Sequence, residues 1–320
     1  MTQTRRFLPD TMNGVVTSVS TRYVLVTPAH NEERLIERAI ESVLKQTVPP
    51  MRYVIVNDGS SDSTATIAER YSKIDATVTV LHIPHGGRRC FSNKVRAFHA
   101  GFAAIKHMQF EFVGNLDADI SLAPDYFERL LSEFAHDPRL GIGGGRVHTL
   151  RNGRFVGQSV AADSVAGGVQ LFRRDCYEDI GGYLPLPYGG IDAAAEIMAR
   201  ARSWRTRTFP ALQAFEHRQT GWAVSNAVAG RMTEGKRFYT LGYGMLFFVA
   251  RCLRHCMDSP PLYGSAVAFA GYCQSLLRRE PLALPVETVR YLRREQRGKL
   301  WRLCKSPRSI AARWPARVTA

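Results

Sequence analysis

The chain has 320 residues, of which 45% are hydrophobic and 22% are charged. This length suits one large α/β domain with an appendage or two modest domains, and the composition argues against disorder. The 43 basic and 28 acidic residues give a formal net charge of +15, so we expect anionic partners: nucleotides, nucleic acid or an anionic membrane surface.

The N-terminus and the cysteines give little sign of secretion. No long apolar run precedes Thr21, so a secretory signal is not expected, and residues 1–20 are interpreted as an N-terminal tail. The six cysteines form no CxxC pair, which favours buried reduced thiols over a metal site. Reduced thiols fit a cytoplasmic protein.

Short apolar runs alternate with amphipathic stretches in the first half of the chain. Strands are predicted at Tyr23–Thr27, Tyr53–Val56, Val78–Ile83 and Phe110–Leu116. Helices are predicted at Glu32–Gln46, after Ser63, at Asn93–Lys106 and at Pro124–Phe134. This alternation predicts a mostly parallel sheet flanked by helices, with the loops after Thr27, Val56 and Leu116 sharing one cleft.

The pattern changes after about Gly141. Gly143–Gly145 and Val165–Phe172 suggest strands of a mixed arrangement, followed by a helix at Ile191–Arg202 and a strand at Trp204–Phe209. From about Gly221 the sequence becomes helical and basic. We therefore expect an α/β domain over residues 21–222 and a helical basic region over 223–320.

The C-terminal region combines apolar stretches with positive charge. Tyr239–Ala250 and Leu262–Leu277 fall short of the ~20 apolar residues that a spanning helix needs, so we interpret them as buried or interfacial helices. The 43 residues Arg278–Ala320 hold twelve Lys and Arg against three Glu, a net charge of +9. A solvated tail, membrane-surface contact and nucleic-acid binding all fit this charge; the preceding apolar segments favour the membrane surface.

The strongest chemical feature is Asn115-Leu116-Asp117-Ala118-Asp119, in which an apolar strand delivers two carboxylates into a loop. At strand spacing both side chains can point to one side. Close carboxylates raise each other's pKa unless a cation offsets their charge, and hard oxygen ligands favour Mg²⁺ or Mn²⁺. A solvated turn with two aspartates is the simpler reading of this motif taken alone.

The loops after the first two strands supply context. Thr27–Glu33 (TPAHNEE) and Val56–Thr64 (VNDGSSDST) both open helices, and helix N-termini offer backbone N–H groups to anions. Asp58 is expected to bind a ribose or base, whereas Asp62 and Ser63 are expected to cap the helix. His30 is interpreted as a surface residue.

The motifs TPAHNE, VNDGSSDST and LDAD, in this order, resemble family 2 glycosyltransferases of the GT-A fold over residues 23–219. The resemblance implies an inverting transferase that uses a nucleotide-diphospho-sugar. It implies that Pro28, Ala29, Asn31 and Glu32 line the nucleotide site. It also implies that Asp58 meets the base or ribose, that Asp117 approaches the ribose or the metal, and that Asp119 ligates the metal.

Further site residues come from the same resemblance. Arg88, Arg89 and Lys94 are alternatives for the residue near the diphosphate, with Arg89 taken into the predicted nucleotide site. Asp192 matches the acidic residue that starts a helix after a Gly-rich loop, and it is the predicted general base. The predicted acceptor-binding residues are Gln170, Arg173 and Glu196, with Glu196 also the second candidate for the base. His217 is a further candidate ligand of the metal or diphosphate.

The predicted activity is therefore transfer of a single sugar to a glycan or lipid-linked acceptor, in exopolysaccharide or O-antigen-type assembly. The enzyme is expected to be cytoplasmic and peripheral on the inner face of the membrane, with no nucleic-acid partner. Two alternatives remain. A nucleotidyltransferase acting on sugar phosphates would normally show a Gly-rich phosphate loop after the first strand. A non-enzymatic nucleic-acid-binding protein is suggested only by the net charge.

Overall fold

The computed structural model describes residues 22–86, 91–218, 227–254 and 263–305. The predicted N-terminal tail, Arg88 and Arg89 lie outside these residues. The strands are β1 Tyr23–Ala29, β2 Arg52–Asp58, β3 Val78–Ile83, β4 Phe112–Asn115, β5 Ile120–Leu122, β6 Leu140–Arg151, β7 Arg154–Gly157, β8 Leu171–Arg173 and β9 Arg205–Glu216. The helices are α1 Ile36–Leu44, α2 Thr64–Ile74, α3 Phe91–Ile105, α4 Tyr126–His136, α5 Arg174–Asp179, α6 Ile191–Ala201, α7 Ala227–Thr240, α8 Met245–Arg254, α9 Tyr263–Leu277 and α10 Val286–Lys305.

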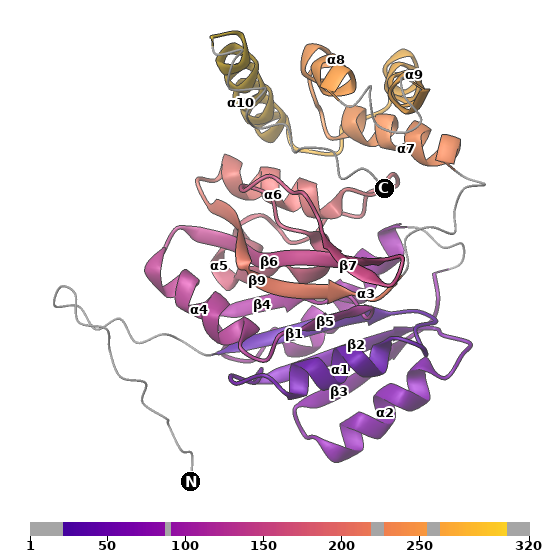
Figure 1. The fold of residues 1–320 in the computed structure, drawn as a ribbon, viewed down its shortest axis with the longest axis vertical. Helices are drawn as coiled ribbons and strands as arrows, with labels where there is room; N and C mark the ends of the chain where they lie inside the picture. The colour runs from indigo at the N-terminus through magenta and orange to yellow at the C-terminus, as the bar shows by residue number, and fades with distance from the viewer. Residues whose placement is uncertain (1–21, 87–90, 219–226, 255–262, 306–320) are drawn as a thin grey trace, which may run out of the picture.

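The strands join in one mixed sheet with the order β3-β2-β1-β4-β8-β6-β9-β5, and β7 pairs with β6 (Figure 1). Strands β3, β2, β1 and β4 run parallel, whereas β8 is antiparallel to both of its neighbours. Ala29 lies opposite Asn57, and Val26 lies opposite Asn115. The loops that follow β1, β2 and β4 therefore emerge at one edge of the sheet, as the sequence predicts.

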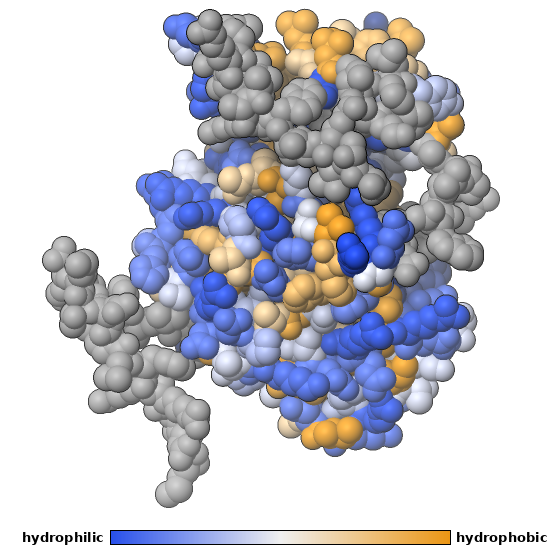
Figure 2. All heavy atoms as spheres, viewed as in Figure 1, coloured by the Kyte–Doolittle hydropathy of each residue, from blue (hydrophilic) through white to orange (hydrophobic). Residues whose placement is uncertain are grey.

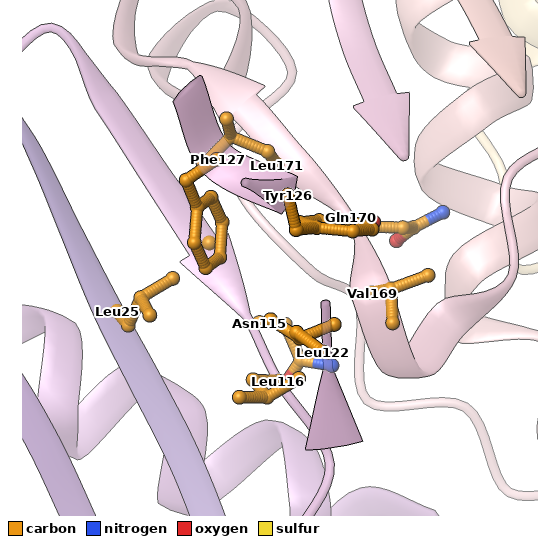
Figure 3. Close-up of a pocket in the computed structure, with 10 residues that line it drawn as sticks. Leu25, Asn115, Leu116, Leu122, Tyr126, Phe127, Val169, Gln170 and Leu171 are labelled. Carbon is orange, nitrogen blue, oxygen red and sulfur yellow. The ribbon is translucent and has the colours of Figure 1, made fainter. Parts of the chain in front are cut away.

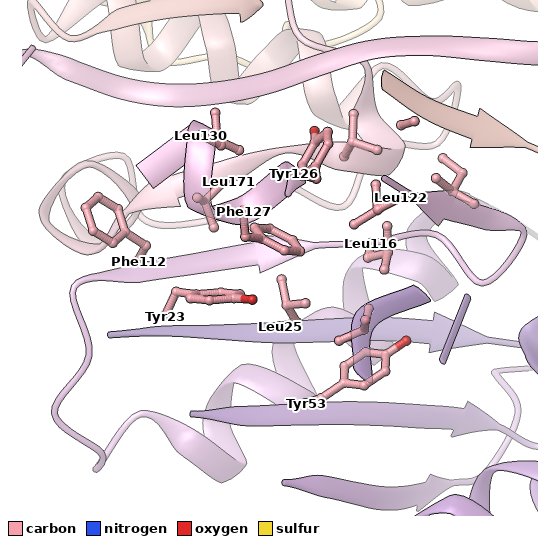
Figure 4. Packing of buried hydrophobic residues seen from close by; sticks show 14 of the residues in the cluster. Tyr23, Leu25, Tyr53, Phe112, Leu116, Leu122, Tyr126, Phe127, Leu130 and Leu171 are labelled. Carbon is pink, nitrogen blue, oxygen red and sulfur yellow. The ribbon is translucent and has the colours of Figure 1, made fainter. Parts of the chain in front are cut away.

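Alternating side chains cover the two faces of the sheet. Tyr23 and Leu25 belong to a core that includes α1 and α4, and Figure 4 shows aromatic rings filling the space between sheet and helix. Val24 and Val26 face the other way, into a core with α3, α5 and α6. The continuous apolar run of β1 is thus buried on both faces, as a central parallel strand requires.

The C-terminal helices gather at one end of the molecule, beside α6 (Figure 1). Leu284, Val289 and Leu292 are buried in the same core as residues of α6, so this region packs against the α/β part. Within the described residues, none of the helices combines the length and apolarity needed to cross a bilayer.

Three predicted elements differ most from the structure. The stretch Tyr239–Ala250, expected as one helix, is divided by residues 241–244 between the end of α7 and the start of α8. The expected strand Val165–Phe172 is a 3₁₀ turn, Gly167–Val169, followed by the short strand β8. The first helix begins at Ile36 rather than Glu32, because Asn31 takes a left-handed conformation with φ of 55° and turns the chain first.

Candidate active site

The loops after β1 and β2 hold each other through side-chain hydrogen bonds. The Asn31 side-chain oxygen accepts from the Ser61 backbone N–H at 2.8 Å, and the Thr64 hydroxyl accepts from the Glu32 backbone N–H at 2.7 Å. Burial opposes ionisation of Asp62, but hydrogen bonds from Thr64 outweigh it and lower the pKa of this carboxyl. This arrangement agrees with the predicted capping role of Asp62 and gives the loop pair a fixed shape.

The predicted nucleotide residues lie along this edge. Ala29 is buried, and Pro28 is half-buried opposite Val56. The side chain of Asp58 is 5% exposed, and its Oδ1 accepts from Arg96 at 2.5 Å. Its Oδ2 lies 3.2 Å from Nδ1 of His85. Asp58 is thus a buried carboxylate held by two basic side chains.

His30, interpreted from the sequence as a simple surface residue, is part of this arrangement. It is half-buried, and its Nδ1 lies 2.7 Å from the backbone oxygen of Asp58. Its ring stacks on that of His85 at 4.1 Å between centroids and 13° between planes. Potential ligand atoms of His30, Asp58 and His85 lie within 4.8 Å of one another. Nδ1 of His85 also lies 3.1 Å from the Asp58 backbone oxygen, so both rings direct this nitrogen at one carbonyl, and we interpret the pair as a support for the loop that carries Asp58.

The loop after β4 brings Asp117 and Asp119 to the same edge. Lys94 Nζ donates to Asp117 Oδ1 at 2.5 Å, and Arg218 Nε donates to Asp119 Oδ2 at 2.8 Å. Arg218 also forms an ion pair with Glu32. One guanidinium therefore joins the loop after β1 to the loop after β4, at residues far apart in the sequence.

The carboxylates of this loop suit a hard divalent cation. Burial raises the pKa of Asp119, the neighbouring charge of Asp117 raises it further, and the Arg218 ion pair opposes both effects. Two close, partly buried carboxylates need positive charge to stay ionised, and here Lys94 and Arg218 supply it. Oxygen donors in this setting fit Mg²⁺ or Mn²⁺.

His217 lies beside this loop. Its backbone N–H donates to the Asp119 carbonyl at 2.9 Å. Its Nε2 lies 2.7 Å from the Ser121 hydroxyl, and its Nδ1 lies 3.4 Å from Arg38. Burial and the Arg38 charge lower the pKa of His217, which favours the neutral ring that can bind a metal. In this conformation the ring contacts Ser121 rather than the carboxylates.

Two glycines separate Asp117 from Asp192. A Cβ on Gly168 would lie 3.0 Å from Asp117 Oδ2, and a Cβ on Gly167 would lie 3.0 Å from the Asp192 Cβ. The 3₁₀ turn is therefore closely packed between the two carboxylates, and larger residues would displace one of them. Asp192 is half-buried in the first turn of α6, and it lies against Gly167 while the carboxylate of Asp117 lies against Gly168.

The predicted acceptor residues Gln170 and Glu196 lie in the protein interior. Glu196 is 4% exposed and accepts from the Val165 N–H at 2.6 Å and from Gln170 Nε2 at 3.3 Å. Gln170 Oε1 accepts from the Tyr183 hydroxyl at 2.7 Å. These bonds support the turn beside Asp192, and we leave both residues out of the proposed acceptor site.

Arg173 lies at the far end of β8 from the Gly167–Val169 turn. Its guanidinium donates to the backbone oxygen of Phe134 at 2.9 Å and lies over the rings of Phe112 and Phe134. This side chain anchors α4 to the sheet, so the proposed acceptor site is built without it. The buried cavity near Asn115 and Gln170 has a volume of only about 10 Å³, too small for a sugar (Figure 3).

Glu196 provides a pH-dependent prediction. Burial raises its pKa to about 7, so the folded state binds a proton that the unfolded state releases near pH 4.5. Between pH 4.5 and pH 7 the free energy of unfolding therefore falls as pH rises, by on the order of 3 kcal/mol for Glu196 alone. We expect Glu196→Gln to flatten the decline in unfolding free energy from pH 5 to pH 8, measured by chemical denaturation. Glu178→Gln, at an exposed ion pair, is the control and should leave the slope unchanged.

Several of these contacts involve residues that sequence reasoning missed or left open. The sequence leaves Lys94 as one of three alternatives near the diphosphate and indicates no role for Arg96, His85 or Arg218. The sequence does contain one signal for these basic partners: Lys94 and Arg96 lie two residues apart at the start of a predicted helix. Arg89 lies outside the described residues.

Comparison with known proteins agrees with this geometry. Residues 24–181 match the family model described as Glycosyl transferase family 2. The chain is 33% identical over 109 residues to the uncharacterized glycosyltransferase EpsJ of Bacillus subtilis, covering 34% of this chain and 29% of EpsJ. It is 26% identical over 238 residues to the poly-beta-1,6-N-acetyl-D-glucosamine synthase of Staphylococcus epidermidis, covering 68% of this chain and 53% of the synthase. The chain therefore spans less than two thirds of either relative.

A solved structure shows the same fold. The mannosyltransferase PcManGT from Pyrobaculum calidifontis, in complex with GDP-Man and Mn²⁺, superposes with a TM-score of 0.52 at 18% identity. The match covers 92% of this chain and 81% of that one, so it extends beyond the residues of the family model. The motif loops, the sheet that aligns them and the family match lead to one conclusion: residues 24–181, which carry the motifs, form a domain of glycosyltransferase family 2.

Proposed function

We propose that the protein is an inverting transferase, in which an acceptor hydroxyl displaces the nucleoside diphosphate of a nucleotide-diphospho-sugar. The observation that carries this proposal is the bridge from Glu32 through Arg218 to Asp119. This bridge holds the loop after β1 beside the acidic loop after β4. A diphosphate bound there would meet both the backbone N–H groups and the positive charge that it needs. Family membership favours this reaction over nucleotidyl transfer.

The donor site follows from the basic and acidic side chains at this edge. Asp58 accepts hydrogen bonds from the base or ribose, beside the stacked rings of His30 and His85. Asp119 and Asp117 would hold Mg²⁺ or Mn²⁺, with His217 as a further ligand after its ring turns from Ser121. Such an ion offsets charge on the departing diphosphate. Lys94 and Arg218 offer positive charge at the same place.

The acceptor side uses Asp192. An oxygen of its carboxylate takes the proton of the attacking hydroxyl, and this carboxylate lies against Gly167, next to the glycine that Asp117 contacts. The carboxylate proposed to hold the metal and the carboxylate proposed as the base thus contact neighbouring residues of one turn. The hydroxyl attacks the sugar from the face opposite the diphosphate, so the configuration at the reacting carbon is inverted.

The acceptor is a lipid-linked or polysaccharide intermediate of bacterial exopolysaccharide or O-antigen-type synthesis. One relative is a polysaccharide synthase by its printed name, which supports this pathway class. The basic C-terminal helices support a cytoplasmic enzyme peripheral on the inner face of the membrane, where a lipid-linked acceptor lies.

A panel of UDP-, GDP- and dTDP-sugars, each with Mg²⁺, Mn²⁺ or EDTA, tests the donor side. We expect at least one sugar nucleotide to raise the melting temperature only when a divalent cation is present. A ligand at 100 times its Kd stabilises the folded state by ~2.7 kcal/mol, which corresponds to several degrees in a chain of this size. The same donor should be slowly hydrolysed. A panel with no metal-dependent response to any nucleotide sugar would contradict the proposal.

A further inference from the structure

A groove of about 560 Å³ lies between the start of α8 and one face of α10. Leu246 and Phe247 line one wall. The other wall carries arginines at helical spacing, and these are Arg290, Arg293, Arg294 and Arg297. The groove lies in the C-terminal part of the chain and is separate from the proposed sugar-transfer site.

The arginine face of α10 is the side turned away from the protein core. Val289 and Leu292 on the opposite face are buried. Val286–Lys305 contains seven Lys and Arg against two Glu. Within the described part of the chain, Arg290, Arg294 and Arg297 form no ion pair with a carboxylate. The fold therefore leaves concentrated positive charge in this groove without neutralising it.

Apolar side chains accompany this charge. The Leu246 side chain is 78% exposed and that of Trp301, one turn beyond Arg297, is 60% exposed. Lys305 Nζ lies 3.8 Å from the Trp301 ring centroid. Figure 2 shows hydrophobic residues at this end of the molecule, where α8 and α9 lie. Exposed leucine and tryptophan beside arginine is the combination that helices at a membrane interface use.

We propose that the α8–α10 groove docks on a membrane surface containing anionic phospholipids, with the arginines on phosphate groups and Leu246 and Trp301 in the apolar boundary. The inference builds on the proposed membrane location of the enzyme and identifies the face that makes the contact. Charge complementarity selects this occupant. Residues 306–320 carry three Arg and no acidic residue, so like charge disfavours them as the occupant. A nucleic acid would leave the exposed Leu246 without a partner.

Co-sedimentation of the full chain with vesicles tests this surface without donor or metal. We expect binding to vesicles of phosphatidylcholine with phosphatidylglycerol, weak binding to phosphatidylcholine alone, and loss of binding in high salt. Arg290→Gln with Arg294→Gln should lower the partition coefficient by on the order of 10-fold. Leu246→Ser should also weaken binding. Arg139→Gln with Arg151→Gln removes the same charge from exposed sites of the α/β domain and should bind as the wild type does.

Each outcome separates this inference from the proposed reaction. If the α10 double variant binds anionic vesicles as well as the wild type does, the groove is not the docking surface. If no variant binds vesicles while DNA is retained in an Arg290- and Arg294-dependent way, the occupant is a nucleic acid and the proposal is overturned. Donor hydrolysis that persists without vesicle binding overturns the docking surface alone. Equal melting temperatures show that the variants are folded.

Discussion

Asp192→Asn is expected to keep donor binding and to lower the rate of sugar transfer by ~10²- to 10⁴-fold, the usual contribution of a general base. The amide cannot accept the proton of the attacking hydroxyl, yet it occupies nearly the same volume beside Gly167. The measurement is kcat for transfer together with Kd for the sugar nucleotide. The expected pattern is a fall in kcat with little change in Kd.

A matched control for this variant is Asp175→Asn. Asp175 is an exposed aspartate in the first turn of α5. Like Asp192 in α6, it lies near a helix N-terminus, where the helix dipole favours negative charge. Its substitution should leave transfer unchanged. Transfer by Asp192→Asn at the wild-type rate would show that another group removes the proton.

Asp119→Asn is expected to abolish the metal-dependent stabilisation by the sugar nucleotide and to lower kcat/KM by ~10²- to 10³-fold or more. The change removes an ionised hard ligand, and it also leaves Arg218 with Glu32 as its remaining carboxylate partner. The melting temperature of the free variant should change little, because removing a buried, partly offset charge relieves a desolvation cost.

Asp125→Asn is the control, at an exposed ion pair with Arg129 on α4. It should retain the metal response in full. If Asp119→Asn responds to Mg²⁺ or Mn²⁺ as the wild type does, the cation is not held at this loop. A loss of donor binding in both the presence and the absence of metal would instead indicate that Asp119 acts through Arg218.

The sequence predicts the α/β half of the fold well because its signals are local. The strand Val78–Ile83 has the predicted bounds. A short run of alternating apolar residues between two turns fits a strand better than a helix. Val165–Phe172 was wrong as a single strand, because an apolar run interrupted by glycines fits a turn as well as a strand. The start of α1 at Ile36 depends on the left-handed Asn31, which contacts a second loop.

The sequence places Asp58, Asp117 and Asp119 at one edge of the sheet, because each stands at or just after the end of a strand in a motif. Their basic partners could not be predicted, since pairs such as Arg218 with Glu32 join residues 186 positions apart. Spacing along the chain also does not show burial. Glu196 and Gln170 resemble cleft residues in the sequence, but in the structure they bind each other and the backbone beneath the Gly167–Val169 turn.

The link between α6 and α10 has a geometric consequence. Arg200 of α6 lies 3.6 Å from Glu295 of α10, and Lys299 bonds Glu295 at 2.6 Å and Asp163 at 3.3 Å. The helix that bears Asp192 is therefore braced against the helix that bears the arginine face. An enzyme bound to a bilayer through that face would hold Asp192 at a constant height above the lipid phosphates. This fixed height would favour acceptors whose hydroxyl protrudes from the bilayer by a matching distance.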